Sequence, residues 1–300
     1  MVSATVGAAR PRVLVILDGA AEDPGRGPTS LEIARTPVLD ALAAEGAVRA
    51  VRTIPEGLPA GSEVGIPVLL GVRPTVAPGR GLLEAAALGI ELPEGSWAWR
   101  VDVPRGFVPR EVPPGLRHLR GHRYLWVGEA PPRLGPPWRV WPRGGALPGP
   151  LGPSTAIVAA PGVAAGCGRL LGARVVIPSG ATGDVDTDHA AKVRAAAGAM
   201  ADARQVVVHL GAPDEASHRF DRAGKVAALE AIDAQVLGPL REEVGARGGV
   251  LEVVCDHGTD PATGEHLADP VPSLRWGAGV GPAGPSRFVE RALAEEVRAA

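Results

Sequence analysis

The 300-residue chain contains little cysteine and little lysine, and its net charge is close to zero. Its two cysteines, Cys167 and Cys255, lie far apart and match no paired metal or redox spacing, so we expect two buried thiols in a reducing compartment. Lysine occurs only at Lys192 and Lys225 among 31 basic residues, a bias that we attribute to genomic GC content rather than to function. A net charge of −2 argues against a protein that binds nucleic acid by general electrostatic attraction.

The sequence also lacks long apolar runs. None approaches the roughly 18 residues of a membrane-spanning helix, and runs such as Val13–Leu17 have the length of strands. The first residues, MVSATVGAARPR, lack the apolar core of a signal peptide. With 45% hydrophobic and 21% charged residues, the composition is that of an ordered globular protein. We therefore expect a soluble, cytoplasmic protein with neither a membrane nor a nucleic-acid partner, and the oligomeric state is left open.

Apolar runs rich in β-branched residues predict buried strands that alternate with helices. The expected strands are Val13–Leu17, Val175–Ile177, Val206–Leu210 and Leu251–Cys255. A proline at the first helical position predicts a helix that begins at Pro37 and ends before Gly46. Apolar residues at helical spacing predict a second helix over Val226–Val244, with a break or kink at Pro239. This alternation is typical of an α/β fold with a mostly parallel sheet flanked by helices.

The middle of the chain departs from this pattern. Residues 101–150 hold 11 prolines and 8 glycines, and five of the six tryptophans fall between Trp97 and Trp141. Because proline-dense sequence does not sustain long helices or central strands, we expect a loop-rich insertion or, in preference, a small cap domain whose aromatic residues form a core or line a cleft. The expected division is a discontinuous catalytic α/β domain and a reduced cap, over residues 1–93 with 153–300 and residues 94–152.

Aspartates follow three of the expected strands. Asp18 and Asp256 directly end two of them, and Asp214 comes shortly after a third. Ligands and catalytic groups of open α/β sheets gather at the carboxyl ends of strands, so we expect these three carboxylates at one edge. Taken singly, an aspartate at such a position is more often a helix cap or a turn residue, but the set of three favours a site.

Three histidines stand close to these aspartates in the sequence. His257 directly follows the last of them, His218 lies one helical turn beyond the middle one, and His266 ends the segment DHGTDPATGEH. Oxygen and nitrogen ligands suit Mn²⁺ or Zn²⁺, and the six residues are enough for two ions, which would neutralise a phosphate. We interpret His189 and His209 as structural or surface histidines.

Ser62 stands in the segment GLPAGSE. A serine next to glycine in an irregular turn is usually a turn residue or a helix N-cap. The alternative is a nucleophile that a metal ion activates, because a free serine hydroxyl is a poor nucleophile at neutral pH. The local sequence does not decide between these two interpretations.

Seven segments follow one another along the chain: LDGAAEDP, TSLEIARTPVLDALAAEG, GLPAGSEVGIPVLLG, GRGLLEAAALGIEL, SGATGDVDTDHAAK, VVVHLGAPDEASHRFDRAGKVAALEAID and VCDHGTDPATGEHLADPVP. In this order they resemble the cofactor-independent phosphoglycerate mutases of archaeal type, which belong to the alkaline-phosphatase-like superfamily of metalloenzymes. The resemblance spans roughly residues 12–90 and 153–272, with a looser match at WAWRVDV and HRYLWV.

This resemblance implies an isomerase that interconverts 3-phosphoglycerate and 2-phosphoglycerate by metal-dependent phosphoryl transfer. Ser62 would take the phosphoryl group and return it to the 2-hydroxyl of the retained glycerate. Two divalent metal ions are implied, with Mn²⁺ the first choice and Zn²⁺ or Mg²⁺ as alternatives. The implied ligands of the ion that activates the nucleophile are Asp18, Ser62, Asp256 and His257. Those of the other ion are Asp214, His218 and His266.

Two arginines and one lysine match further positions of the resembling family. Arg100 in WAWR and Arg123 in HRYLWV are candidates for binding a substrate phosphate or carboxylate, since a guanidinium offers two parallel donors. An ordinary surface salt bridge is an equal alternative for both. Lys192 matches the lysine that closes the GATG segment, and we place it among the substrate-binding residues without a stated role. The expected partner is a small phosphorylated carboxylate.

Two departures from the family bear on the reaction. Glu63 follows the serine, where the family usually has aspartate, and the chain is shorter between about Val127 and Trp138, a region replaced by GEAPPRLGPPWRV. A mutase must hold phosphoserine and glycerate together without water, whereas a phosphatase lets water enter. The reduced cap therefore leaves open a phosphohydrolase, or a mutase for another small phosphorylated or phosphonate metabolite.

A different class of protein, a non-catalytic relative that binds a metabolite, is a further alternative. Such a relative is expected to have lost a ligand or the nucleophile, and none of the seven implied residues is missing. A sulfatase is not indicated, because no Cys or Ser stands in the C/S-x-P-x-R context of that class.

Overall fold

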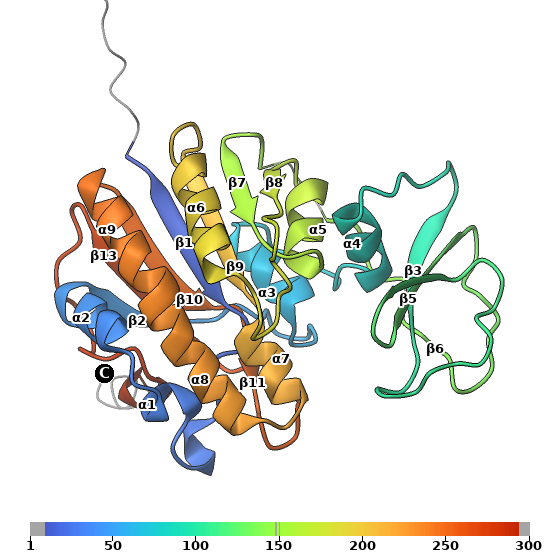
Figure 1. Cartoon of the computed structure of the whole chain (residues 1–300), viewed down its shortest axis with the longest axis horizontal. Helices are drawn as coiled ribbons and strands as arrows, with labels where there is room; N and C mark the ends of the chain where they lie inside the picture. Colours follow the sequence, from blue (N-terminus) through green and yellow to red (C-terminus); the bar gives the residue numbers. More distant parts are fainter. Residues whose placement is uncertain (1–9, 148, 150, 294–300) are drawn as a thin grey trace, which may run out of the picture.

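The computed structural model describes residues 10–147, 149 and 151–293. The larger part of the described chain surrounds a seven-stranded sheet with the order β2-β13-β10-β1-β9-β7-β8 (Figure 1). Its strands are β1 (Arg12–Leu17), β2 (Ala47–Val51), β7 (Thr155–Val158), β8 (Arg174–Val176), β9 (Gln205–Leu210), β10 (Val250–Cys255) and β13 (Val271–Gly277). Neighbours from β10 to β8 run parallel, and β13 is antiparallel to β10 and β2. The predicted α/β fold with a mostly parallel sheet is confirmed.

The central strands of this sheet end at one level. Leu17 of β1 pairs with Leu210 of β9 and with Cys255 of β10, so the residues that follow these strands emerge side by side. In β1 and in β9 every residue except the first is buried, as expected of parallel strands that are covered on both faces. The main core consists of these strands and the apolar faces of the helices packed on them.

Helices alternate with these strands, and α6, α8 and α9 lie together over one side of the sheet (Figure 1). In the described chain the α-helices are α1 (Ser30–Ile33), α2 (Pro37–Glu45), α3 (Ser62–Leu69), α4 (Arg80–Ala87), α5 (Val163–Leu170), α6 (His189–Ala199), α7 (Ala212–His218), α8 (Arg222–Ile232) and α9 (Gly238–Ala246). The first predicted helix is α2, with the predicted ends. The second is divided into α8 and α9 by a π-helical turn, Asp233–Leu237, directly before the segment that contains Pro239.

A second sheet of four antiparallel strands, the small sheet, lies beside α4 (Figure 1). Its strands, in the order β4-β5-β3-β6, are β3 (Trp97–Asp102), β4 (Arg117–Arg120), β5 (Arg123–Gly128) and β6 (Arg139–Val140). Val101, Val103 and Tyr124 form a small core against which Trp126 and Trp138 pack. The prolines between residues 103 and 142 all lie outside the strands, since proline cannot donate to a ladder of backbone hydrogen bonds.

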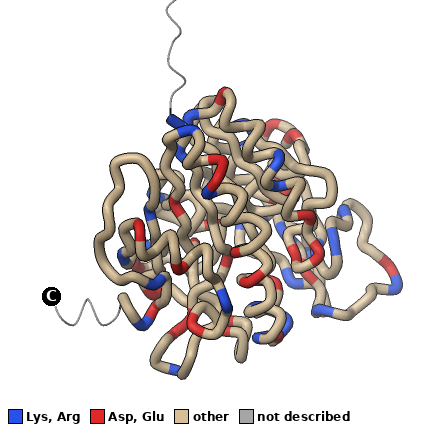
Figure 2. Tube along the Cα trace, turned by 60° about the vertical axis from the view of Figure 1, so that its left-hand side comes forward, with Lys and Arg blue, Asp and Glu red and all other residues tan. Residues whose placement is uncertain are grey.

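Three further features of the described chain complete the fold. A short hairpin of β11 (Gly258–Thr259) and β12 (His266–Leu267) follows β10 and folds the chain back on itself. Basic and acidic residues are interspersed along the Cα trace rather than separated by sign (Figure 2). No helix in the described residues combines the length and the apolar character that a bilayer crossing needs.

Three ionisable side chains, Glu22, Lys225 and Glu290, are buried together. Lys225 Nζ lies 3.1 Å from Glu22 Oε1, and the backbone N–H of Glu22 donates to Glu290 Oε1 at 2.8 Å. Burial raises the pKa of Glu290 to about 7, although the Thr29 hydroxyl donates to this carboxylate at 2.7 Å. Glu290 therefore keeps its proton in the folded protein over a pH range in which the unfolded chain has lost it.

From Glu290 we expect the free energy of unfolding to fall as the pH rises from about 4.5 to about 7, by at most about 3 kcal/mol. The sign follows because the folded protein binds this proton more tightly than the unfolded chain does. Glu290→Gln cannot lose the proton and is expected to flatten the decline. Urea unfolding of the wild type and of Glu290→Gln in the presence of a chelator, at about pH 5 and about pH 7.5, measures the decline in the free energy of unfolding. An equal decline in the variant contradicts the assignment of this effect to Glu290.

Candidate active site

Two of the predicted carboxylates meet where the central strands end. Asp18 directly follows β1, Asp256 directly follows β10, and both are buried. The backbone N–H of Gly19 donates to Asp256 Oδ1 at 3.1 Å. Gly19 has a φ of +59°, and a Cβ at this position would lie 2.5 Å from Asp214 Oδ1. Glycine is therefore required at this turn, because a side chain here would occupy the space of the Asp214 carboxylate.

Ser62 is the first residue of α3 and lies against this strand edge. Its Oγ donates to Asp18 Oδ1 at 3.0 Å and lies 3.2 Å from His257 Nε2. The helix comes close because residue 65 is glycine: a Cβ on Gly65 would lie 2.2 Å from the Asp256 carbonyl oxygen. Of the two interpretations of Ser62, this placement favours a reactive hydroxyl over a turn or cap residue.

His257 and Asp256 are adjacent in the sequence at this edge, and both are fully buried. Burial favours the neutral imidazole, but the negative charges of Asp256, Asp18 and Asp214 outweigh it and raise the pKa of His257 to about 10. Burial and the neighbouring Asp18 raise the pKa of Asp256 to about 7. Both shifts express an excess of negative charge in a space that water does not reach, which is where a divalent cation binds well.

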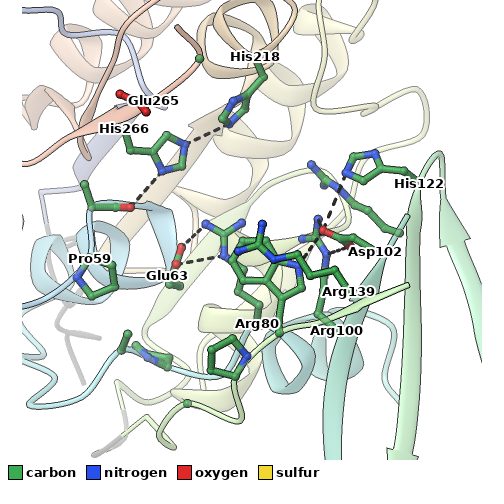
Figure 3. A pocket seen from close by; sticks show the side chains of 18 of the residues that line it. Pro59, Glu63, Arg80, Arg100, Asp102, His122, Arg139, His218, Glu265 and His266 are labelled. Carbon is green, nitrogen blue, oxygen red and sulfur yellow. Dashed lines mark hydrogen bonds and ion pairs between the residues drawn. The ribbon is translucent and has the colours of Figure 1, made fainter. Parts of the chain in front are cut away.

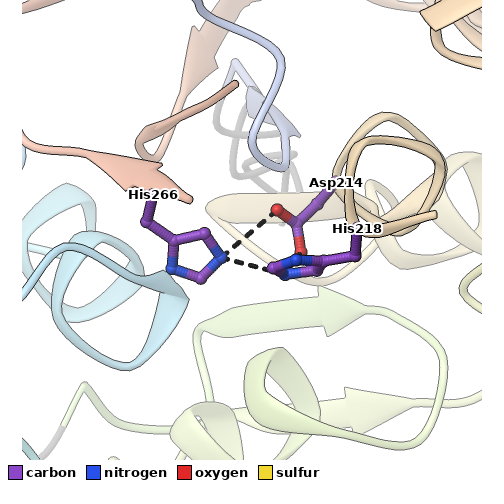
Figure 4. Close-up of side chains that lie close together, drawn as sticks. All are labelled: Asp214, His218 and His266. Atoms are coloured by element: carbon purple, nitrogen blue, oxygen red, sulfur yellow. Dashed lines mark hydrogen bonds and ion pairs between the residues drawn. The ribbon is translucent and has the colours of Figure 1, made fainter. Parts of the chain in front are cut away.

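Asp214, His218 and His266 form a second group beside the first (Figure 4). Asp214 and His218 lie one turn apart in α7, with Asp214 Oδ2 3.2 Å from His218 Nε2. His266 in β12 places its Nε2 3.1 Å from His218 Nε2 and 3.4 Å from Asp214 Oδ1. Its Nδ1 lies 3.0 Å from the Ala60 carbonyl oxygen, which orients the ring as in many metal-binding histidines. The rings of His257 and His266 have centroids 4.2 Å apart, so the two groups adjoin.

The structure brings all six predicted aspartates and histidines into groups whose ligand atoms lie within 4.8 Å of one another. The groups are Asp214 with His218 and His266, Asp18 with Asp214 and His257, and Asp18 with His209 and Asp256. Asp18 is shared by two of the groups, so the carboxylates serve one continuous site.

His209 is the member of these groups that the sequence analysis did not include. It lies in β9, is buried, and places its Nε2 3.1 Å from Asp18 Oδ2; a surface position is therefore wrong. The available signal was a histidine in the apolar run VVVHL, near the end of a strand that leads to Asp214. His189 is also buried, but its Nδ1 lies 3.3 Å from Gln235 Oε1, and it belongs to none of the groups found in the described residues.

Lys192 lies beneath the site rather than in it. The side chain is fully buried in α6, and its Nζ donates to the His209 carbonyl oxygen at 2.9 Å. Burial lowers the pKa of Lys192 to about 8. The structure thus places this lysine behind β9, where it supports the strand that carries His209.

Arg100 and Arg123, the other two predicted substrate-binding residues, lie on the small sheet and line a cavity. Arg100 is buried and binds Asp102 through Nε at 2.7 Å and Nη2 at 3.1 Å. Arg123 Nη2 lies 3.3 Å from Glu215 Oε1. Both arginines therefore combine an ion pair within the protein with a position at the cavity wall.

This cavity, of about 740 Å³, opens between the group that contains His218 and His266 and the small sheet (Figure 3). Pro59, Glu63, His218 and His266 line the side of the seven-stranded sheet. The basic side chains that line the cavity are Arg80, Arg100, Arg105, Arg123, Arg139 and His122. Arginine forks bind carboxylates and phosphates through two parallel hydrogen bonds, so the cavity suits a small anionic molecule.

Comparisons with known proteins agree with this geometry. The family model for 2,3-bisphosphoglycerate-independent phosphoglycerate mutase matches residues 43–104, and the model for the Metalloenzyme superfamily matches residues 154–298. A 2,3-bisphosphoglycerate-independent phosphoglycerate mutase from Methanothermobacter thermautotrophicus is 29% identical over 89% of this chain and 89% of its own. The chain is similar to this mutase family and to the metalloenzyme superfamily.

Solved structures share the fold of this chain. A protein from Pyrococcus horikoshii superposes with a TM-score of 0.80 at 28% identity, over 96% of this chain and 91% of that chain. The alkaline phosphatase from the Antarctic bacterium TAB5 superposes with a TM-score of 0.50 at 10% identity, over 97% of this chain and 98% of that chain. The predicted alkaline-phosphatase-like fold is confirmed.

The chain is shorter than its mutase relatives. The alignment with the Methanothermobacter thermautotrophicus mutase extends over 357 positions, whereas 89% of the 300 residues here is about 267 residues. About 90 positions are therefore filled by the relative alone. This agrees with the expectation of a reduced chain, and the location of the loss between Val127 and Trp138 stays a prediction.

The similarity to the metalloenzyme superfamily implies divalent metal ions, and the residues of this site fit them. Asp256 Oδ2 is buried and has no hydrogen-bond partner among the described residues. His218 and His266 direct two ring nitrogens at one another across 3.1 Å, an arrangement that needs a proton or a cation between the lone pairs. Carboxylate oxygens and imidazole nitrogens are the ligand types that Mn²⁺ and Zn²⁺ accept.

Proposed function

We propose that this protein interconverts 3-phosphoglycerate and 2-phosphoglycerate through a phosphoserine on Ser62, with two bound divalent metal ions. The observation that carries the proposal is the position of Ser62 Oγ, 3.0 Å from Asp18 Oδ1 and 3.2 Å from His257 Nε2, beside the metal-ligating groups. The name of the Methanothermobacter thermautotrophicus relative supports the choice of substrate. Mn²⁺ is the first choice of metal, with Zn²⁺ and Mg²⁺ as alternatives.

The metal ligands are assigned in two sets. Asp18, Ser62, Asp256 and His257 would hold the ion next to the nucleophile, as the sequence resemblance implies. Asp214, His218 and His266, whose ligand atoms lie within 4.8 Å of one another, would hold the other. When bound, two such ions lower the pKa of the serine hydroxyl and neutralise charge on the phosphoryl group.

The remaining steps belong to the side chains of the protein. The hydrogen bond to Asp18 orients Ser62 Oγ, which takes the phosphoryl group as the bond between phosphorus and the 3-oxygen of the substrate breaks. Glycerate stays in the cavity, and its 2-hydroxyl then takes the phosphoryl group from Ser62. The 3-oxygen gains one proton and the 2-hydroxyl loses one, so the isomerisation is balanced. Arg100 and Arg123 supply positive charge for the substrate phosphate and carboxylate.

We expect the parts of the chain that contain the two sheets to have different roles in the reaction. We assign residues 1–93 and 153–300 to the catalytic domain, and residues 94–152 to a cap that contains the small sheet. The cavity lies where the two meet, since its lining comes from both. A mutase needs the cap to keep water from the phosphoserine while glycerate is retained.

A phosphohydrolase is the second candidate, because about 90 alignment positions of the relative have no counterpart here. The same Ser62 and ligands would then transfer the phosphoryl group to water. A mutase for another small phosphorylated or phosphonate metabolite would use the same groups with a different occupant of the cavity.

Trapping of the phosphorylated protein tests the covalent mechanism. The protein is mixed with Mn²⁺ and 3-phosphoglycerate, denatured within one turnover and digested for mass spectrometry. We expect one phosphoryl group on the peptide that contains Ser62, because the serine oxygen carries it between the half-reactions. A phosphoryl group on another residue, or product formation without any labelled peptide, contradicts the mechanism.

A further inference from the structure

Arg80, at the beginning of α4, contacts two groups from different parts of the molecule (Figure 3). Its Nε donates to Glu63 Oε1 at 3.0 Å and its Nη2 to Glu63 Oε2 at 2.8 Å. On its other side, the guanidinium carbon lies 4.8 Å from the centroid of the Trp141 ring. The side chain of Arg80 is 17% exposed and that of Glu63 is 7% exposed, so the ion pair between them is largely shielded from water.

The contact with Glu63 acts on the nucleophile. Glu63 directly follows Ser62 in the first turn of α3, and its carboxylate is buried. A buried carboxylate needs a partner, and the fork of Arg80 meets both of its oxygens. The rotation of the first turn of α3, and with it the direction of Ser62 Oγ, is therefore tied to the position of Arg80.

The contact with Trp141 acts on the cap. Trp141 follows β6, its backbone N–H donates to the Arg100 carbonyl oxygen at 2.9 Å, and its indole N–H donates to Asp102 Oδ2 at 2.7 Å. The indole is thus fixed to the small sheet and presents its ring to Arg80. Arg139 lies 4.9 Å from the same ring centroid, and a cation held over an indole is attracted by the ring.

A parallel connection exists at the metal-ligating side of the site. Glu215 directly follows Asp214, as Glu63 follows Ser62, and its Oε1 lies 3.3 Å from Arg123 of the small sheet. Two acidic residues that adjoin site residues in the sequence therefore each bind an arginine that contacts the small sheet or belongs to it. The Arg80 connection is the one attached to the nucleophile.

We infer that Arg80 is a positioning residue that holds the nucleophile helix and the cap in one arrangement, and so determines whether the phosphoserine passes its phosphoryl group to glycerate or to water. The inference rests on the proposed function. Transfer to the 2-hydroxyl of glycerate gives 2-phosphoglycerate. Transfer to water breaks the same bond between Ser62 Oγ and phosphorus, gives inorganic phosphate and leaves free glycerate. A cap that is no longer aligned with Ser62 admits water during the lifetime of the phosphoserine.

The test compares the ratio of inorganic phosphate to 2-phosphoglycerate formed from 3-phosphoglycerate with Mn²⁺. In Arg80→Gln we expect this ratio to rise by about tenfold or more, since the fork and the stacked cation are both lost. Arg80→Lys keeps the charge but not the two parallel donors, and its ratio should lie between those of the wild type and Arg80→Gln. Arg143→Gln is the matched control: Arg143 is exposed and stacks on Trp97 of the same sheet with 4.3 Å to the ring centroid, and its removal should leave the ratio unchanged.

A second variant separates positioning from folding. Arg80→Gln leaves Glu63 buried without its partner, which can destabilise α3; Arg80→Gln with Glu63→Gln removes both charges. We expect the double variant to unfold at the temperature of the wild type or close to it and still to release phosphate. A folded double variant with the wild-type ratio overturns the inference, as does an Arg80→Gln protein that shows only a raised KM, because Arg80 would then bind substrate and nothing else.

Hydrogen exchange gives a readout that does not depend on the reaction. In Arg80→Gln, but not in Arg143→Gln, we expect faster exchange in both α3 and β3, because the connection between them is lost. If the wild type forms neither isomer nor phosphate, the proposed function fails, and the exchange still decides whether Arg80 holds the nucleophile helix and the cap in one arrangement. Unchanged exchange in both elements contradicts it.

Discussion

Replacement of Ser62 by alanine is expected to lower the formation of both 2-phosphoglycerate and inorganic phosphate by about four orders of magnitude or more. In the proposed mechanism the serine oxygen carries the phosphoryl group, and no other hydroxyl replaces a missing nucleophile. The content of bound metal should change little, because Asp18, Asp256 and His257 keep their places. Initial rates, with metal content measured by mass spectrometry on the same samples, check the two statements together.

Ser217→Ala is the matched control for this substitution. Ser217 is a buried serine next to a predicted metal ligand, but its hydroxyl donates to the Pro213 carbonyl oxygen at 2.8 Å within α7. Its loss should leave the rate near that of the wild type. Isomer formation by Ser62→Ala at a rate like that of Ser217→Ala would remove the covalent mechanism.

Replacement of His218 or His266 by alanine is expected to lower the bound metal from two ions per chain toward one. Each histidine supplies one of three ligand groups that meet within 4.8 Å, and two protein ligands hold a divalent ion poorly. The rate of isomerisation should fall with the metal content. Metal analysis after extensive dialysis measures the stoichiometry.

His118→Ala controls for the loss of any histidine, because His118 is exposed on the small sheet and its Nε2 contacts the Gly121 carbonyl oxygen at 2.9 Å. The control should bind as much metal as the wild type. If both site variants also keep the full stoichiometry, there is no second metal at this position.

The strand edge could be predicted from the sequence because its determinants are local. Each buried strand appears as a short apolar run, and parallel strands place their carboxyl ends together. Asp18 and Asp256 had to meet once Leu17 and Cys255 were in register. His218 follows Asp214 by one helical turn, which fixes their common side.

Contacts between distant segments could not be predicted in this way. Arg80 contacts Glu63 and Trp141 only because the small sheet forms between them in the sequence and brings Trp141 back to Arg80. The periodicity of apolar residues contains no information about this arrangement. His209 was missed because one histidine in an apolar strand resembles a buried structural residue. Lys192 matched a family position, and only the packing of α6 against β9 shows that its amine supports the strand.

The two products of one reaction test the central claim most directly. The purified protein is given Mn²⁺ and 3-phosphoglycerate, and 2-phosphoglycerate and inorganic phosphate are followed in parallel. The proposed function predicts 2-phosphoglycerate with little or no phosphate, because the cap retains glycerate and excludes water. Phosphate without 2-phosphoglycerate would contradict it and make the protein a phosphohydrolase.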